Sequence, residues 1–386
     1  MKKRPEYNPL YWLAALGAGG LTVSFFVYIN FMVPHKGVPM ATFDQVYPAL
    51  IKGDWLSIVT AISLIFIVIF SGLHIKLLWW NIKQFAIYKK TAAYTSMKES
   101  NNEVQLFAIP LTLAMTINVF FVVFALFVPH LWDYVEYLFP GALAAFVVAG
   151  YYVLKIFAEY LSRLLAHGDF DFGQNNSLAQ MLSVFAFTMV GVGFAAPAAM
   201  STTLSVNAIG AFGSLFFISV AMLLLMIKLT LGFKSMFKDG IAPEATPTLW
   251  IIIPILTLIG ISLVRLFFGF EHRFHAEMPK TDMFVLTSVI ISLQTIFGLL
   301  GYAVMKRVKY FKTYIFGDKQ SVPSLALICP GVAFTVFYLF LIQYGFVFTG
   351  IVDKYSVVYF VMTAPILYIH YKTVYYFFKI KSHLDL

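Results

Sequence analysis

Apolar residues dominate ten long stretches of the chain, and short polar segments separate them. A helix needs about 20 mostly apolar residues to cross the hydrocarbon core of a bilayer, and each stretch is long enough. The first stretch is too long for a signal-peptide core and lacks a small-x-small cleavage site, so we expect it to persist as a helix. The predicted spans are residues 10–33, 58–80, 104–128, 139–165, 178–200, 208–233, 249–270, 283–308, 325–351 and 357–378.

The loops leave no room for a separate folded domain, because the longest polar stretches are residues 34–54 and 89–102. We therefore expect residues 1–386 to form one all-α transmembrane domain embedded in the lipid bilayer. Only 12% of the residues are charged and 60% are hydrophobic, whereas a soluble chain has about 25% charged residues. The composition excludes a soluble enzyme and a nucleic-acid-binding domain.

Motifs that carry enzyme chemistry are also missing from the sequence. It contains no Gly-rich phosphate loop, no His-Glu-x-x-His run and no Gly-x-Ser-x-Gly elbow. The single cysteine, Cys329, excludes an intramolecular disulfide and metal sites built from four cysteines. Two histidines and two carboxylates in residues 271–277 are more typical of an interfacial loop than of a metal site. We expect neither an enzyme nor a bound metal or cofactor.

The Lys and Arg residues are distributed unequally between the two sides of the predicted membrane. Of the 27, 21 lie on the side that holds both termini, and six lie on the other. Because positively charged loops stay in the cytoplasm, this bias predicts that both termini are cytoplasmic. It also favours an even number of spans.

Two recurring features indicate a repeated hairpin. A lysine lies near the cytoplasmic end of every even-numbered span, at intervals of 66 to 79 residues, which suggests a unit of roughly 75 residues. The simplest interpretation of each lysine is that it snorkels to the headgroups, and the regular spacing suggests the repeated unit in addition. The five are Lys76, Lys155, Lys228, Lys306 and Lys372.

Prolines recur near the start of four odd-numbered spans. Proline removes a backbone hydrogen bond and kinks a helix, and in a bilayer the freed carbonyl must face protein or water. We therefore predict that the odd-numbered spans are interior and the even-numbered spans peripheral. The first of these prolines is Pro9, and the predicted kinks lie at Pro110, Pro254 and Pro330.

Several short motifs occur in a fixed order along these spans. Asn8-Pro9 opens the first, Phe107-Ala-Ile-Pro-Leu-Thr112 lies in the third and Pro247-Thr-Leu-Trp-Ile-Ile-Ile-Pro254 in the seventh. Asn176-Ser-Leu-Ala-Gln precedes the fifth, and Cys329-Pro330 lies in the ninth. With five hairpins and cytoplasmic termini, the chain resembles the tellurite-resistance/dicarboxylate transporter (TDT) family. That family includes the bacterial channel TehA and the slow anion channels of plants.

The resemblance implies a pseudo-fivefold ring of hairpins, with odd-numbered helices around a central pore for small anions and even-numbered helices outside. It also implies a homotrimer in which each protomer has its own pore. With the short loops, it suggests a bacterial inner membrane. The family closes its pore with a phenylalanine just before the proline of the ninth helix, where this chain has Cys329. Either another aromatic such as Phe185, Phe187 or Phe334 closes the pore, or gating or substrate differs.

Polar residues of the odd-numbered spans are the candidates for lining such a pore. Hydroxyl and amide groups can replace part of the hydration of an anion without holding it tightly, although Ser and Thr often bond carbonyls of their own helix. Arg265 is the one basic residue well inside an odd-numbered span, where it could attract anions, snorkel or pair with Glu271. The other candidates are Thr22, Ser24, Asn30, Thr112, Thr116, Asn118, Ser183, Thr188, Thr257, Ser262 and Thr335.

Three further functions stay open at this point. The first is a saturable carrier for a dicarboxylate, sulfite or another oxyanion. The second is a membrane subunit of a redox enzyme, in which His74 and His370 would hold haem. The third is an assembly or regulatory partner without transport of its own. The odd-numbered spans have no carboxylate near their middle, which suits a channel better than a proton-coupled pump.

Overall fold

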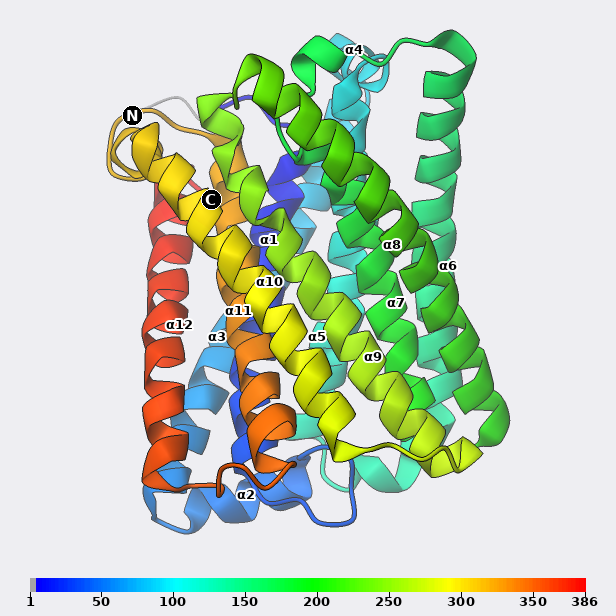
Figure 1. The fold of residues 1–386 in the computed structure, drawn as a ribbon, viewed down its shortest axis with the longest axis vertical. Helices are drawn as coiled ribbons and strands as arrows, with labels where there is room; N and C mark the ends of the chain where they lie inside the picture. Colours follow the sequence, from blue (N-terminus) through cyan, green and yellow to red (C-terminus); the bar gives the residue numbers. More distant parts are fainter. Residues whose placement is uncertain (1–4) are drawn as a thin grey trace.

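The computed structural model describes residues 5–386, which form helices, turns and loops without any strand. Ten helices in this part of the chain are long and apolar enough to cross a membrane, so the predicted all-α, ten-span membrane protein is confirmed (Figure 1). The helices of these spans are α1 (Trp12–Met32), α3 (Trp55–Tyr88), α5 (Ala108–Phe127), α6 (Leu131–His167), α7 (Leu182–Met200), α8 (Leu204–Asp239), α9 (Ile252–Phe274), α10 (Lys280–Arg307), α11 (Ile328–Phe340) and α12 (Val357–His383).

A short 3₁₀ segment precedes the α-helix of every odd-numbered span. Pro110, Pro254 and Pro330 are each the third residue of the α-helix that follows. A proline ring clashes with the carbonyl four residues earlier in a continuous α-helix, and the tighter 3₁₀ turn avoids that geometry. These prolines therefore mark a change of helix type at the start of a span. The 3₁₀ segments are Pro9–Tyr11, Asn101–Phe107, Ala179–Met181, Pro243–Ile251 and Val322–Leu327.

Burial separates the ten spans into two groups. In the odd-numbered spans, 61 to 94% of the most apolar window is buried, against 22 to 33% in the even-numbered spans. We call α1, α5, α7, α9 and α11 the buried helices, and α3, α6, α8, α10 and α12 the exposed helices. Among the buried helices, α1 packs against α5 and α11, α7 packs against α5 and α9, and α9 packs against α11.

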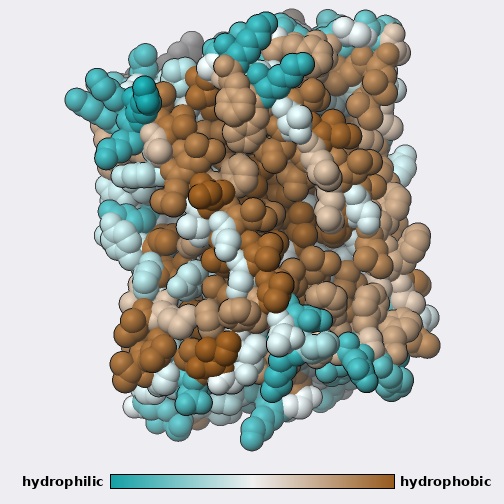
Figure 2. All heavy atoms as spheres, in the orientation of Figure 1, coloured by the Kyte–Doolittle hydropathy of each residue, from teal (hydrophilic) through white to brown (hydrophobic). Residues whose placement is uncertain are grey.

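The surface agrees with a position in a membrane. Figure 2 shows hydrophobic atoms across the middle of one face and hydrophilic atoms at its two ends. The C-terminus and the start of the described chain lie at the same end of the bundle as α4 (Ala92–Lys98), and α2 (Phe43–Ile51) lies at the other (Figure 1). The chain is thus a multi-pass membrane protein. Lys2, Lys3 and Arg4, which contribute to the charge bias, lie outside the described residues.

The observed helices differ from the predicted spans mainly at their ends. The predicted span 139–165 lies within α6, and 208–233 lies within α8. These helices continue into polar residues that hydropathy does not detect, since a helix does not need to end where the hydrocarbon ends. By contrast, α11 passes into a π-helical segment, Leu341–Val347, and stops before the predicted end at 351.

Candidate functional site

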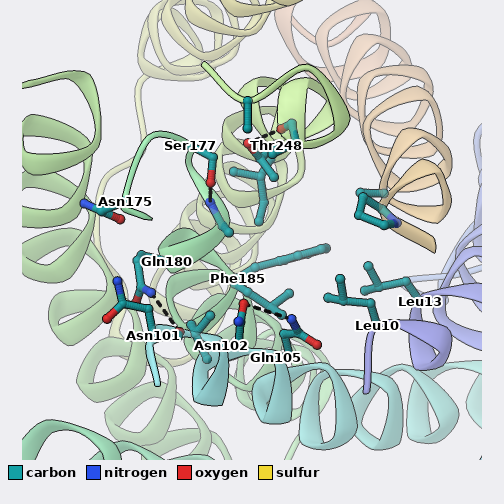
Figure 3. Close-up of a pocket in the computed structure, with 18 of the residues that line it drawn as sticks. Leu10, Leu13, Asn101, Asn102, Gln105, Asn175, Ser177, Gln180, Phe185 and Thr248 are labelled. Atoms are coloured by element: carbon teal, nitrogen blue, oxygen red, sulfur yellow. Dashed lines mark hydrogen bonds between the residues drawn. The ribbon is translucent and has the colours of Figure 1, made fainter. Parts of the chain in front are cut away.

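A cavity of about 280 Å³ lies at the end of the bundle where the buried helices begin. Its walls come from the 3₁₀ segments before all five buried helices, together with nearby loop residues, and we call it the vestibule (Figure 3). Side-chain amides and hydroxyls supply its polar lining. These residues are Asn101, Asn102, Gln105, Asn175, Asn176, Ser177, Gln180 and Thr248.

Hydrogen bonds between the 3₁₀ segments and loops fix the vestibule wall. The Asn101 side chain donates to the carbonyl oxygen of Asp171 at 2.7 Å and accepts from its backbone N–H at 3.2 Å. Gln180 Nε2 donates to the Asn101 carbonyl at 3.1 Å, and Thr248 Oγ1 accepts from the Leu178 N–H at 3.0 Å. Side chains thus join the starts of α5, α7 and α9.

A group of charged residues contacts the 3₁₀ segment Asn101–Phe107, which forms part of the vestibule wall. Glu103, which is 2% exposed, accepts from Arg163 Nε at 2.9 Å and lies 3.5 Å from Lys98 Nζ. Burial alone would lower the pKa of Lys98, but its hydrogen bond to Glu159 and the charge on Glu103 raise that pKa above its ordinary value. Arg163 also bonds Asp169. The 3₁₀ segment that carries Asn101 is therefore fixed by a cluster of ion pairs around Glu103.

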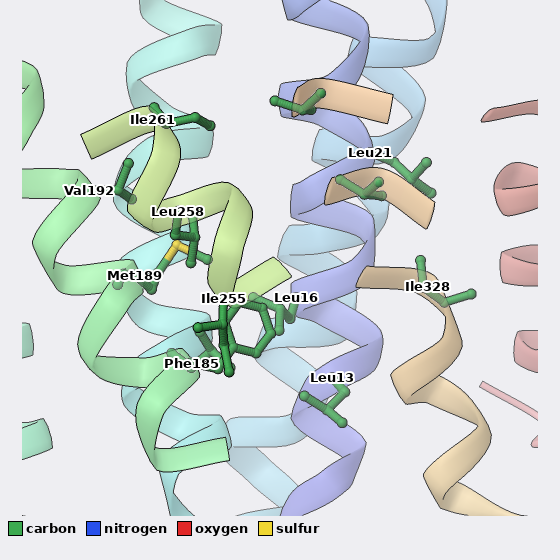
Figure 4. Close-up of a cluster of buried hydrophobic side chains, with 14 of the residues drawn as sticks. Leu13, Leu16, Leu21, Phe185, Met189, Val192, Ile255, Leu258, Ile261 and Ile328 are labelled. Carbon is green, nitrogen blue, oxygen red and sulfur yellow. The ribbon is translucent and has the colours of Figure 1, made fainter. Parts of the chain in front are cut away.

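A second, smaller cavity of about 80 Å³ lies deeper in the bundle. Residues of all five buried helices line it, and we call it the central cavity. Its lining is apolar apart from Thr257, whose hydroxyl donates to the carbonyls of Ile253 and Ala333 at 3.1 and 3.0 Å. Figure 4 shows the surrounding apolar cluster, which includes Phe185 and Leu258.

Three residues line both cavities: Phe185, Pro254 and Cys329. Phe185 is the largest of them and is 4% exposed. The vestibule and the central cavity are therefore adjacent, and the Phe185 ring lies at their boundary.

The structure separates the four gate candidates into two pairs. Phe185 and Cys329 lie at the boundary between the cavities. Phe187 instead packs against Phe157 and Phe217, with ring centroids 5.3 and 5.9 Å away. Phe334 lines a groove on the outer surface of the bundle. Neither Phe187 nor Phe334 lines either of the two cavities.

Most of the predicted pore-lining side chains satisfy backbone carbonyls instead of facing a cavity. Among the twelve, Thr257 alone lines one of the two cavities. Asn30 accepts from the Ala41 N–H, Asn118 donates to the Ala114 carbonyl, and the buried Thr335 hydroxyl has no protein partner in the described chain. The hydroxyls that bond a carbonyl three or four residues earlier are those of Thr22, Ser24, Thr112, Thr116, Ser183, Thr188 and Ser262.

Two half-buried cations form no ion pair within residues 5–386. Arg265 Nη1 donates to the Val192 carbonyl at 3.0 Å, rather than pairing with Glu271. Lys228 Nζ donates to Ser183 Oγ at 2.6 Å and to the carbonyl of Gln180, a vestibule residue, at 3.1 Å. The charge on both side chains is therefore left uncompensated by protein carboxylates.

The two histidines considered as haem ligands are engaged with protein groups. His74 contacts the Ala15 carbonyl through Nδ1 at 2.8 Å and Thr116 Oγ1 through Nε2 at 2.9 Å. His370 Nε2 lies 3.0 Å from Ser24 Oγ. His74 thus has no ring nitrogen free for iron. In the described part of the chain, no three His, Cys, Asp or Glu residues are grouped as metal ligands.

The amides of the vestibule were not among the predicted site residues. Sequence reasoning placed the site in the middle of the spans, whereas these residues precede the α-helices. The available signal was the recurrence of Asn, Gln or Ser just before odd-numbered spans, as in Asn101-Asn102 and Asn176-Ser177.

No protein-family model matches this chain, and no curated protein shows significant similarity to it. Fold and site define it as a multi-pass α-helical membrane protein in which five buried helices surround two adjacent cavities. Its ten apolar helices suggest a transporter-like protein.

Proposed function

We propose that this protein conducts small anions across the membrane along a pathway between its buried helices, closed in this state by Phe185. The observation that carries the proposal is the adjacency of the vestibule and the central cavity, with Phe185 at their boundary. A bulky apolar side chain at a narrow point suits a gate, since a dewetted constriction stops ions.

In this proposal the five buried helices form a pseudo-fivefold ring, as in the TDT family, with the exposed helices outside. The closed series of contacts from α1 through α5, α7, α9 and α11 back to α1 supports it. The contrast in burial between the two groups of helices supports it as well.

Electrostatics favours an anion over a cation. All five buried helices begin around the vestibule, so the positive ends of their dipoles converge there. Lys228 and Arg265 add positive charge without a compensating carboxylate, and the vestibule amides offer N–H donors. Among the described residues, no carboxylate lines either cavity.

Three further parts of the proposal follow from the charge bias and the resemblance. The first is that the protein lies in a bacterial inner membrane with cytoplasmic termini, which would make the vestibule the cytoplasmic mouth. The second is a homotrimeric assembly, and the third is membership of the TDT family. Labelling of cysteines introduced near the termini of intact cells tests the orientation. Native mass spectrometry tests the trimer.

The test of conduction is current through purified protein in planar bilayers under a chloride gradient. We expect Phe185→Ala to raise the current at least about ten-fold, with a reversal potential that follows chloride. Phe212→Ala is the control, because that ring is 74% exposed on α8 and lines neither cavity, and it should leave the current unchanged. Equal currents for both variants, or a reversal potential that follows the cation, would contradict the proposal.

The alternative function is a saturable carrier for a dicarboxylate, sulfite or another oxyanion. The shape of the vestibule favours it: an amide-lined space of about 280 Å³, closed on its inner side, resembles a binding site open to one side only. A carrier would give saturable exchange of labelled sulfite or malate in liposomes, without the current that Phe185→Ala should release.

A further inference from the structure

A groove of about 580 Å³ opens on the outer surface between the exposed helices α10 and α12. Its floor is α11, which is visible between these two helices in Figure 1. Pro330, Gly331 and Phe334 form the floor, while Leu299 and Ile369 contribute apolar side walls. Because both flanking helices are exposed spans, the groove faces the lipid.

One cation lies in this mostly apolar groove. Lys372 is half-buried, and its Nζ lies 5.5 Å from the centre of the Tyr368 ring. It forms no ion pair with any residue in the described range. Tyr302, Tyr368 and Tyr376 also line the groove. Lysine and tyrosine side chains together are typical of the level where the hydrocarbon meets the headgroups.

We propose that the groove binds an anionic phospholipid, with one acyl chain along α11 between α10 and α12 and its phosphate paired with Lys372. The volume lies within the range of about 300–1,000 Å³ that is usual for small-molecule sites. An apolar space open to hydrocarbon is filled by an acyl chain rather than by water, and an uncompensated cation selects a negative headgroup.

The groove is one helix away from the cavities. Pro330 lines both the groove and the vestibule. Gln294 lines the groove and donates to the hydroxyl of Thr257, which lines the central cavity, at 2.7 Å. A bound chain would therefore support the helix that carries Cys329. The lipid site does not depend on anion conduction, because binding is measured without flux.

The test is native mass spectrometry of the purified protein titrated with phosphatidylglycerol or with phosphatidylcholine of identical chains. The wild type should bind phosphatidylglycerol more tightly. Lys372→Gln should weaken that binding roughly five-fold, as expected for one lysine against an anionic headgroup, and leave phosphatidylcholine unaffected. Lys372→Arg should retain the preference. Lys83→Gln removes an exposed cation of α3 outside the groove and should change nothing.

A second variant tests the acyl-chain part of the site. A Cβ added at Gly298, in the groove wall, meets only Ile253 Cδ1 at 3.9 Å, so Gly298→Trp fills the groove without a clash at Cβ. It should weaken the binding of both lipids. Equal binding of both lipids to the wild type, or equal effects of Lys372→Gln and Lys83→Gln, would overturn the proposal. A change of oligomeric state in Gly298→Trp with unchanged lipid binding would overturn it too, and would assign the groove to a second copy of the chain.

Discussion

Phe185 on α7 and Cys329 on α11 line both the vestibule and the central cavity, so these two buried helices contribute to the boundary between them, together with α9 through Pro254. The two side chains differ greatly in size, and only the phenyl ring is large enough to fill a constriction. In the proposed pathway, closure therefore comes from α7 rather than from α11, which carries the smaller side chain of Cys329.

A gate built on α7 predicts that a ring on α11 can replace it. We expect Phe185→Ala to open the pathway and the double variant Phe185→Ala/Cys329→Phe to lower the current again, by about ten-fold. The phenyl ring introduced at position 329 would lie at the same boundary between the vestibule and the central cavity as the ring of Phe185. Planar-bilayer currents of the two variants, with Phe185→Ala/Cys329→Ala as the control, give the comparison. A double variant that conducts as well as Phe185→Ala would show that position 329 does not reach the constriction.

Lys228 should contribute to charge selectivity. Lys228→Gln removes the charge while keeping donors for Ser183 Oγ and the Gln180 carbonyl. Because Lys228 Nζ contacts the carbonyl of Gln180, which lines the vestibule, loss of its charge should lower the chloride-to-potassium permeability ratio. Interactions between unit charges at short range are worth on the order of 1 kcal/mol even in water, so we expect a several-fold fall. Reversal potentials in a KCl gradient measure this ratio. Lys234→Gln, on the exposed surface of the same helix, is the control, and an equal fall in both variants would refute a local role.

The fold was more predictable from sequence than the site was. Ten spans follow from hydropathy alone, because every helix in a bilayer needs a long apolar stretch. The division into buried and exposed spans was predicted from the early prolines, and it agrees with the burial of the two groups. The 3₁₀ segments were not predicted, since Pro110, Pro254 and Pro330 only indicate that the α-helix is interrupted there.

There is a physical reason why the sequence could not predict which side chains of the buried helices point into a cavity. The buried helices are apolar all round, so no polar face indicates their orientation. Phe185 and Phe187 are separated by about 200° around the helix, which means that at most one of them faces a given cavity. Both are phenylalanines in the same apolar helix, so the sequence gives no basis for choosing between them. Only the packing of Phe187 against Phe157 and Phe217 distinguishes the two residues.

Close approach of α9 to α7 should make Gly269 intolerant of a side chain. A Cβ there would lie 2.4 Å from the Ala198 carbonyl oxygen, a backbone atom that cannot turn aside. We expect Gly269→Ala to destabilise the protein by about 1–3 kcal/mol, the usual cost of overpacking. Gly72→Ala is the control, since nothing lies within 4 Å of its added Cβ. Unfolding in detergent should show a lower midpoint for Gly269→Ala, and equal midpoints would contradict the packing.

Stability should depend on pH through His35, in the loop after α1 and outside the spans. Burial of the ring and, more weakly, the charge on Lys354 lower its pKa below the ordinary 6.5, against the opposing hydrogen bond to the Val33 carbonyl. The unfolded chain then binds more protons than the folded one between the two pKa values. The contribution of His35 to stability is therefore fully present above pH 6.5 and declines as the pH falls below it.

We accordingly expect the melting temperature in detergent to fall between pH 7 and pH 5, and His35→Gln to flatten that part of the profile. His130→Gln changes a well-exposed histidine beside Asp44 and serves as the control, with the slope expected to stay as in the wild type. A wild-type slope that survives His35→Gln would assign the pH dependence to another group.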